Sequence, residues 1–429
     1  IFNYQCVKFI NLLNLLVIDN KMKSPRDMTK EELLDFAHQR IFSLGPRDLA
    51  SALAHENMKH GMGKMMYVLD SGDVFCLFGP DATITRNIGR WMSGFGYGVV
   101  IRWPDKGIFF PEIRPNGCGM IIARLDELPP RREIIERVSE VENSDLYLDG
   151  IKIIPDFGKG NHFFEFYKVL EISPDIEKTM PEECNYAILH GSGPERKKEM
   201  YGMIDAGEWI KTPLGKISIL DGNAGKEYYK LWKDFEKFSK KRRELLAKEV
   251  LGKCEIISNL THQGIFAKNE IRLGCHDTMD RSYPRGEALF PVALRWDVPM
   301  YIFKGKENLS DEVICRTGLH EKAEDNMIEE LKKVNILPHG GGYRIDLEYT
   351  NIEVIRTDLG NNFILTGAKP ISRIDEMGKR GVSAFGEMII MNPHELPFDY
   401  RGMSIIEKIM EYDLGIPVAK LQPLMTIKV

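Results

Sequence analysis

Four short stretches in the first third of the chain decide the fold class. They are KMMYVLD (64–70), DVFCLF (73–78), YGVVIRW (97–103) and MIIARL (120–125). Each is a short run of mainly apolar residues, and Gly, Pro or Asp separates it from the next run, which is the pattern of β-strands joined by turns. We therefore predict that all four are strands.

Strand-like runs return through the rest of the chain, with helices between them in no regular alternation. Helices are predicted at 29–41, 131–141, about 225–250, 322–333 and 404–412, and strands at 147–155, 162–172, 185–190, 215–221, 288–296, 299–305, 343–349, 352–357, 362–367 and 387–392. A doubly wound parallel sheet requires strict alternation of strand and helix, so we predict an α+β fold instead. We expect a single large mixed domain with a strand-rich core surrounded by helices.

The composition is that of an ordinary globular protein. Of 429 residues, 43% are hydrophobic and 28% charged, and 58 basic against 63 acidic residues give a net charge of −5. These values exclude disordered, collagen-like and coiled-coil chains and a strongly basic nucleic-acid coat, although a local basic groove remains compatible. The seven cysteines are an odd number without a CxxC pair. We therefore expect a reducing compartment and a cytoplasmic protein.

An apolar stretch, FINLLNLLVI (9–18), lies close to the start of the sequence. Asn11 and Asn14 interrupt it, and no small-residue cleavage site follows it. About ten residues are too few to span a bilayer. Because Met22 opens a conventional polar segment, we interpret 1–21 as an extension ahead of one domain at 22–429, and we expect no membrane partner.

Four of the ten histidines share one setting, because each follows a strand-like run or lies among small turn residues. They are His162 in GKGNHFFEF, His190 in YAILHGSGP, His262 in SNLTHQGIF and His339 in ILPHGGGYRI. A strand end that opens into glycines lets a phosphate-bearing ligand approach backbone N–H groups. One such histidine alone is usually structural, but four in similar turns favour a common site.

Cys118, in the tight turn RPNGCGMII, adds a thiol to these imidazoles. Cysteine and histidine are ligands of borderline divalent ions, so the set predicts Zn²⁺ or Mn²⁺, with the thiolate favouring Zn²⁺. No two of the candidate ligands are closely spaced in the sequence, so spacing alone fixes neither the geometry nor the number of ions.

Four segments together resemble the RtcB-type RNA ligases, in the same order over about 90–429: NGCGM (116–120), GKGNHFFE (158–165), HGSG (190–193) and HGGG (339–342). The final run VAKLQPLMTIKV also resembles the C-terminal end of that family. The resemblance implies an RtcB-like fold. It also implies an enzyme that joins RNA 3′-phosphate or 2′,3′-cyclic phosphate ends to 5′-hydroxyl ends, in tRNA splicing or RNA repair, through a histidine guanylate.

The resemblance also implies roles for individual residues. The metal ligands of the family match Cys118, His162, His190 and His262, and its nucleotide contacts match Asn161, Phe163, Glu165, Gly340, Gly341, Gly342 and Lys428. The guanylated histidine matches His339, with His320 in RTGLHEK as a rival. The implied cofactors are GTP and one or two Mn²⁺ ions, with Zn²⁺ as an alternative, and an activating protein partner is left open.

The chain departs from the family pattern at several positions, among them Pro115, the turn GSGPERK after His190, Asp277, and Tyr343 directly after the glycines. Pro115 stands where the family has a metal-bridging aspartate, so either Glu112 or another group substitutes, or only one ion binds well. Asp277 stands where a lysine is expected, in a segment that we interpret as a polar loop. Besides a ligase, two functions therefore stay open: a diverged homologue that binds metal and RNA without ligating, and a metal-dependent phosphoesterase.

Two further features have a structural and a functional interpretation. Between residues 226 and 249 the chain has nine Lys or Arg and five Asp or Glu, including the run KKRR at 240–243. This helix would form either a phosphate-contacting wall for RNA or, as is more common, a solvated helix face. Asp156, ahead of the GNH turn, is interpreted as a turn former.

Overall fold

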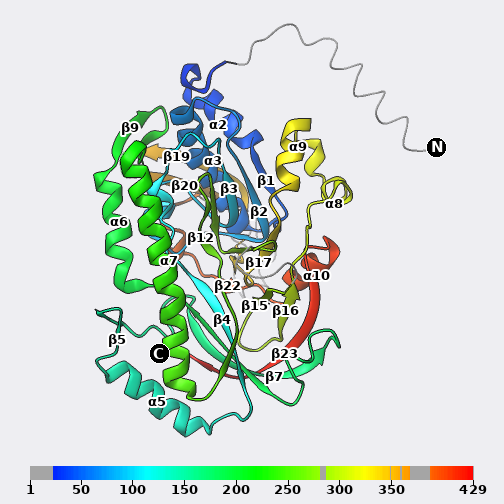
Figure 1. Cartoon of the computed structure of the whole chain (residues 1–429). Coiled ribbons are helices and arrows are strands. Elements are labelled where there is room, and N and C mark those ends of the chain that lie inside the picture. The colour runs from blue at the N-terminus through cyan, green and yellow to red at the C-terminus, as the bar shows by residue number, and fades with distance from the viewer. Residues whose placement is uncertain (1–22, 281–286, 348, 358–359, 368–386, 429) are drawn as a thin grey trace, which may run out of the picture.

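The computed structural model describes residues 23–280, 287–347, 349–357, 360–367 and 387–428 (Figure 1). These residues form one α/β fold with a strand-rich core and helices around it. The predicted extension at 1–21 lies outside the described residues. None of the helices in the described part combines the length and apolar character that a bilayer span needs.

The larger sheet has seven antiparallel strands. In spatial order they are β11 (Glu255–Thr261), β4 (Gly119–Leu125), β8 (Asn185–Gly191), β7 (Phe163–Ile172), β23 (Ile416–Ile427), β16 (Met300–Lys304) and β15 (Leu289–Val292). The C-terminal run therefore lies in the middle of the sheet, between β7 and β16. The strands predicted at 120–125, 162–172, 185–190, 288–296 and 299–305 are confirmed, whereas β11 and β23 are strands that the sequence analysis does not predict.

The register of this sheet brings the four predicted metal ligands to one end of it. β4 begins just after Cys118, β7 begins just after His162, and β11 ends just before His262. His190 is near the end of β8, opposite Phe163 of β7. Because neighbouring strands are antiparallel, the starts of β4 and β7 and the ends of β8 and β11 meet.

The second sheet adds strands that lie against the same end. Its five strands are β1 (Ile41–Ser43), β2 (Phe75–Thr83), β3 (Tyr97–Arg102), β13 (Glu270–Leu273) and β12 (Gln263–Ala267), in that spatial order. His262 joins β11 of the first sheet directly to β12 of the second. A short pair, β14 (Cys275–Asp277) with β17 (Ile336–Pro338), leads into His339.

The remaining strands form small peripheral pairs and one three-stranded sheet. These are β5–β6 (Tyr147–Leu148, Ile151–Lys152), β9–β10 (Glu208–Thr212, Gly215–Ile219), β18–β22 (Tyr343–Arg344, Asp399–Tyr400) and β19–β20–β21 (Tyr349–Thr357, Gly360–Gly367, Glu387–Ile390). In the described ranges, only β18 and β22 of these strands contribute lining residues, Tyr343 and Tyr400, to the pocket beside His339.

Helices cover the outside of the sheets. They are α2 (Lys30–Gln39), α3 (Leu49–Leu69), α4 (Ile88–Met92), α5 (Arg131–Asn143), α6 (Lys197–Ala206), α7 (Gly222–Leu251), α8 (Asp311–Arg316), α9 (Asp325–Lys332) and α10 (Ser404–Glu411). The long helix α7, green in Figure 1, runs along one side of the molecule. Trp232, Phe235 and Phe238 lie on its buried face, and the prediction of a helix at 225–250 is confirmed.

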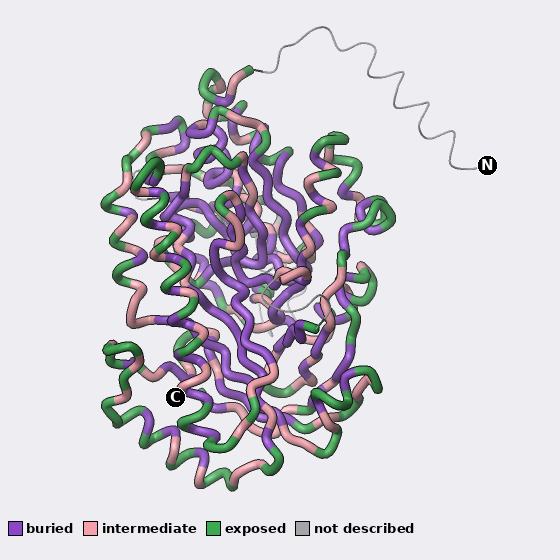
Figure 2. Tube along the Cα trace, in the orientation of Figure 1, coloured by how far each residue is buried: buried purple, intermediate pink, exposed green. Residues whose placement is uncertain are grey.

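The prediction of a strand at KMMYVLD is wrong, because residues 64–69 are the last turns of α3. Asp48 caps this helix by accepting a hydrogen bond from the Ser51 N–H. Met62, Met65 and Met66 are fully buried, and the helix is buried on most of its surface (Figure 2). A helix buried on nearly all sides shows no polar stripe, so its sequence resembles a buried strand.

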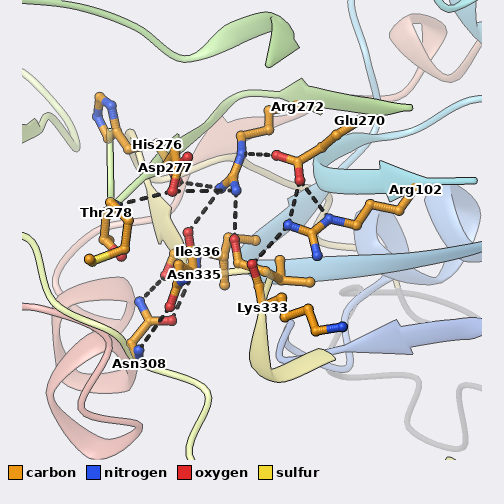
Figure 3. Close-up of polar contacts among 12 residues, drawn as sticks. Arg102, Glu270, Arg272, His276, Asp277, Thr278, Asn308, Lys333, Asn335 and Ile336 are labelled. Carbon is orange, nitrogen blue, oxygen red and sulfur yellow. Dashed lines mark hydrogen bonds and ion pairs between the residues drawn. The ribbon is translucent and has the colours of Figure 1, made fainter. Parts of the chain in front are cut away.

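A buried ion-pair network fixes the strands that lead to His339 (Figure 3). Arg272 of β13 donates from Nε to Glu270 Oε1 at 2.7 Å, and Glu270 Oε2 accepts from Arg102 Nε at 2.5 Å. Asp277 Oδ1 lies 3.5 Å from Arg272 Nη2. We call these four residues, Arg102, Glu270, Arg272 and Asp277, the arginine network.

The same arginine also holds the chain just before β17. Its Nη1 donates to the carbonyls of His276 at 3.0 Å and Asn335 at 2.9 Å, and its Nη2 donates to the carbonyl of Val334 at 2.6 Å. Arg272 therefore ties β13 both to β14 and to the turn that precedes β17, which sets the position of His339.

Candidate metal centre

The structure brings all four predicted metal ligands together. Cys118 Sγ lies 3.1 Å from His190 Nε2 and 3.3 Å from His162 Nε2. His190 Nε2 lies 3.1 Å from His262 Nε2. The potential ligand atoms of Cys118, His190 and His262 all lie within 4.8 Å of one another. His162 is not part of this set of three, but it contacts the Cys118 thiol, and its ring centroid lies 5.3 Å from that of His190.

This donor set fits a divalent metal ion. With bonds of about 2.1 Å to nitrogen and about 2.3 Å to sulfur, a tetrahedral site places its ligand atoms about 3.4–3.6 Å apart. The observed separations are a few tenths of an ångström shorter. Two imidazole nitrogens that face each other can share at most one proton, so a cation is the partner that satisfies all three lone pairs at once.

Hydrogen bonds on the far side of two rings direct their Nε2 atoms towards the thiol. His162 Nδ1 donates to Asp156 Oδ2 at 2.5 Å, and His190 Nδ1 donates to the carbonyl of Asn161 at 3.0 Å. Such contacts fix the tautomer of a metal-binding histidine. The interpretation of Asp156 as a turn former is incomplete: its Oδ1 accepts from the Lys159 N–H in the turn, but its Oδ2 orients His162.

Arg243 of α7 holds two of the ligand-bearing turns together. Its Nη1 donates to the carbonyl of Gly117 at 3.0 Å and to that of Gly191 at 3.1 Å, next to Cys118 and His190 respectively. Its Nε donates to Asn259 Oδ1 at 2.9 Å. This fully buried guanidinium is therefore part of the framework of the site.

Both sequence interpretations of the basic run are wrong for its last two residues. Arg242 and Arg243 are fully buried, so they belong neither to a solvated face nor to an exposed RNA-contacting wall. Arg242 Nε pairs with Glu195 Oε1 at 2.6 Å. The sequence shows only a run of four basic residues. Which of them are buried and which are exposed depends on how α7 packs against the sheets.

The buried environment changes the pKa of the clustered histidines. Burial, reinforced by neighbouring histidines, lowers the pKa of His190 and of His262 well below the ordinary value, which keeps both imidazoles neutral. Burial also opposes protonation of His162. The electrostatic interaction with Cys118 and the hydrogen bond to Asp156 outweigh this effect and raise the pKa of His162 to about 9.

His339 lies against this cluster, and His320 does not. The His339 ring centroid is 4.2 Å from that of His262 and 5.6 Å from that of His190. Its Nδ1 donates to the carbonyl of Gly274 at 2.6 Å. His320 is exposed on the short helix η5 (Leu319–Glu321), with its Nδ1 3.4 Å from the carbonyl of Ile314.

Asp81 of β2 is a residue that the sequence analysis missed. Its side chain is fully buried, and Oδ2 lies 3.6 Å from His339 Nδ1. Neither carboxylate oxygen has a hydrogen-bond partner within the described part of the chain. No motif marks this residue, because an aspartate inside a run such as FGPDAT reads as a turn residue.

A pocket opens beside His339 and contains the predicted nucleotide-binding positions. Its volume is ≈ 710 Å³ when counted out to open solvent. Its lining includes Asn161, Phe163, Glu165, His190, His339, Gly340, Gly341, Gly342 and Lys428. We call it the nucleotide pocket.

Glu165 lies at one wall of the nucleotide pocket. Its carboxylate accepts hydrogen bonds from the hydroxyls of Tyr167 and Thr426. Burial raises the pKa of Glu165, although both hydrogen bonds and the charge of Lys428 act in the opposite direction. Lys428 Nζ donates to the carbonyl of Gly160 at 3.1 Å, so the C-terminal strand closes this side of the pocket.

The three glycines after His339 also have a packing reason. A Cβ at Gly340 would lie 2.4 Å from the Ala293 carbonyl oxygen, and one at Gly341 would lie 2.2 Å from the Arg401 carbonyl oxygen. Gly342 has a φ of +63°. Close approach of neighbouring backbone therefore requires these glycines even without a ligand.

Two other expectations from the sequence need correction. Glu112 does not take the place of the absent aspartate at Pro115, because its Oε1 accepts from the Ser93 hydroxyl at 2.7 Å and its Oε2 from the Ser218 N–H at 2.9 Å. The segment Cys275–Asp277 is strand β14 and not a polar loop. His276 is buried there and donates from Nε2 to the carbonyl of Pro291 at 3.1 Å.

In comparisons with known proteins, no family model matches the chain and no curated protein matches it. The resemblance of the four segments to RtcB-type ligases stays a prediction.

Proposed function

We propose that this chain is an RtcB-like enzyme that joins RNA ends through a histidine-bound guanylate, with GTP and one or two Mn²⁺ ions as cofactors and Zn²⁺ as an alternative. One observation carries the proposal: the cluster of Cys118, His190 and His262 lies against His339, in the wall of a pocket that also contains the predicted nucleotide contacts. A metal site beside a candidate nucleophile is what phosphoryl or nucleotidyl transfer requires.

His339 has the tautomer that nucleophilic attack needs. Because Nδ1 donates to the Gly274 carbonyl, the lone pair of Nε2 is free. In the proposed step Nε2 attacks the α-phosphorus of GTP, a nitrogen–phosphorus bond forms, and the bond to the bridging oxygen breaks to release pyrophosphate. The imidazole becomes positively charged, and the unpartnered carboxylate of Asp81 at 3.6 Å stabilises that charge.

A divalent ion held by Cys118, His190 and His262 would neutralise charge on the phosphates. His162, oriented by Asp156, offers a further nitrogen beside the thiol. With Glu112 engaged elsewhere and proline at 115, this second position has fewer protein ligands than the first. We therefore propose one tightly held ion and a second, weaker one.

Glu165 supports guanine as the base. Guanine presents two adjacent N–H donors on one edge, and adenine does not. The Glu165 carboxylate is held in place by two hydroxyl donors and keeps further lone pairs that can accept from such an edge.

A metal-dependent phosphoesterase is the second candidate. Three protein ligands around one position, with room for a fourth group, is also the arrangement of a hydrolytic zinc site. This alternative predicts phosphate release from a model phosphodiester without any nucleotide. A strict requirement for GTP would exclude it.

The test is covalent labelling. The purified protein is incubated with Mn²⁺ and GTP labelled on the α-phosphate and is then separated on a denaturing gel. We expect an acid-labile, alkali-stable GMP adduct that is lost in His339→Ala and retained in the matched control His320→Ala. A metal-loaded protein without an adduct, or an adduct lost only in the control, would overturn the proposal.

A further inference from the structure

A second, smaller hollow adjoins the nucleotide pocket. The two share Tyr97, Asn161 and Tyr343 as lining residues, and the hollow measures ≈ 350 Å³ counted out to open solvent. The sequence analysis assigned no function to the segment at 84–90 that forms much of its wall. Its polar lining side chains include Arg86, Asn87, Arg90, Asn116, Asn161 and Gln263.

The hollow carries positive charge that no carboxylate balances. Arg90 is buried, and its guanidinium donates to the carbonyls of Ile113 at 2.7 Å and Arg114 at 2.5 Å and to Thr85 Oγ1 at 2.9 Å, which are all neutral acceptors. Arg86 is exposed and lies over the Phe398 ring at 5.6 Å. Within the described ranges neither arginine forms an ion pair, and no lining residue is acidic. A buried guanidinium without an anionic partner is costly.

Gln263 supplies a donor that has nothing to bond with. Its side chain is only 2% exposed, and its Oε1 accepts from the Tyr97 hydroxyl at 3.1 Å. Its Nε2 has no hydrogen-bond partner among the residues that the structure describes. An unpaired buried amide destabilises the folded state by about 1–3 kcal/mol, so such a group at the wall of a hollow marks a place for an acceptor.

The hollow lies next to the candidate metal centre. Asn116 connects the hollow to the candidate metal site, because its Oδ1 accepts from the Cys118 N–H at 3.0 Å.

We propose that this hollow is a phosphate-binding subsite, separate from the nucleotide pocket, in which Arg86 and the Gln263 amide donate to the phosphate oxygens. A phosphate matches an acid-free wall of guanidinium and amide donors, because it is anionic and accepts several hydrogen bonds at once. The subsite holds inorganic phosphate or a terminal phosphate of RNA. The assignment to a second substrate rests on the proposed function, whereas phosphate binding itself does not.

Phosphate binding is tested without metal and without nucleotide. Metal-free protein is titrated with inorganic phosphate at constant ionic strength, and binding is followed by calorimetry. We expect one site per chain, and a dissociation constant that rises about tenfold in Arg86→Gln, since one charge-assisted hydrogen bond is lost. Gln263→Leu should weaken binding in the same direction.

Arg344→Gln is the matched control, because Arg344 is also an exposed arginine but pairs with Asp346 at 2.6 Å outside the hollow. Binding in Arg344→Gln should equal that of the unchanged protein. Absence of saturable binding, equal affinity in Arg86→Gln, or equal weakening in the control would overturn the proposal. The exposed position of Arg86 makes its substitution safe for folding, so the result does not depend on Gln263→Leu.

Competition then identifies the source of the phosphate. Short RNAs that carry a phosphate at the 3′ end, at the 5′ end or at neither end compete with inorganic phosphate for the hollow. If a phosphorylated RNA displaces inorganic phosphate and the unphosphorylated RNA does not, the hollow binds the terminal phosphate of an RNA substrate. If none of the RNAs displaces inorganic phosphate, the assignment to an RNA substrate is overturned. If GTP labelling fails while Arg86→Gln still weakens phosphate binding, the proposed function is wrong and the subsite stands.

Discussion

The arginine network and the histidine cluster are both buried polar groups, but they differ in how their charges are satisfied. Arg272 has an acceptor for each of its guanidinium nitrogens, and Glu270 accepts from two arginines. Within the described chain, no atom of the network is both buried and unpartnered. Around the histidine cluster, by contrast, His262 Nδ1, both Asp81 oxygens and Gln263 Nε2 lack partners.

This difference separates a structural polar group from a functional one. A buried network that satisfies itself fixes the chain, and a ligand has nothing to add to it. A buried group with unpartnered donors and acceptors is stable only if the surrounding fold compensates for it, or if a ligand completes it. The comparison therefore predicts opposite responses of the two regions to substitution and to metal.

The largest effect is expected from Arg272→Met. This change leaves the Glu270 carboxylate buried with only one arginine and frees three backbone carbonyls. Removal of one partner from a buried ion pair usually lowers the free energy of unfolding by about 3–5 kcal/mol. Urea denaturation of the metal-free protein measures this free energy of unfolding. Arg344→Gln, which removes an exposed ion pair, is the control and should change the free energy of unfolding by less than about 0.5 kcal/mol. A loss below about 1 kcal/mol would show that the network is not a structural clamp.

A smaller change in stability, but complete loss of metal, is expected from Cys118→Ala. The thiol contacts both His162 and His190. Metal content by mass spectrometry should fall to background, and the stabilisation that metal gives the unchanged protein, about 4 kcal/mol at a thousandfold excess over the dissociation constant, should vanish. Without metal, the two proteins should unfold within about 1 kcal/mol of each other.

Cys275→Ala is the matched control for this experiment. Cys275 is also a fully buried cysteine, but it lies in β14 and is not one of the clustered ligands. Its substitution should leave metal content unchanged. Normal metal content in Cys118→Ala would contradict the ligand assignment.

That the candidate ligands lie at one place in the fold could be predicted from the sequence, because their signal is local. Cys118, His162, His190 and His262 each stand where a strand meets a glycine-rich or small-residue turn, and antiparallel pairing brings such ends together. The same reasoning favours His339 over His320, since only the former follows a strand and precedes glycines.

The framework of the site could not be predicted, because it depends on contacts between segments far apart in the sequence. Arg243 reaches Gly117 and Gly191 from a helix, and nothing in the run KKRR separates it from its exposed neighbour Lys241. Asp81 lies 258 positions before His339 and follows no motif. The last turns of helix α3, at 64–69, resemble a strand in sequence because burial on nearly all sides removes the periodic polar face.

The smallest effect, and the finest test of the comparison, is the response to acid. Burial would raise the pKa of Glu270, but the charges of Arg272 and Arg102 outweigh it and hold this pKa below its ordinary value. In an unfolded chain a glutamate titrates near pH 4.3, so the unfolded state takes up the proton first. The stability that Glu270 contributes is therefore fully present above about pH 4.3 and is lost as the pH falls towards the folded pKa, by at most about 1.4 kcal/mol per pH unit.

The histidine cluster responds in a higher pH range. Because the pKa values of His190 and His262 are lowered in the fold, the unfolded state binds more protons at these two groups below about pH 6.5, and they lower the stability of the metal-free protein from that point downwards. His162, whose pKa is raised to about 9, acts in the opposite direction and adds stability as the pH falls from about 9 to about 6.5.

Urea unfolding of the metal-free protein from about pH 8 to pH 3.5 should show both effects: the histidine effect below about pH 6.5 and the Glu270 effect below about pH 4.3. In Glu270→Gln the loss of stability that His190 and His262 cause below about pH 6.5 should remain. The difference in the free energy of unfolding between this variant and the unchanged protein should be constant down to about pH 5 and should then shrink. A difference that stays constant to pH 3.5 would mean that Glu270 has the same pKa in the folded and unfolded states, so that the arginines do not stabilise its charge, and the contrast between a self-satisfied network and an incomplete candidate metal site would no longer hold.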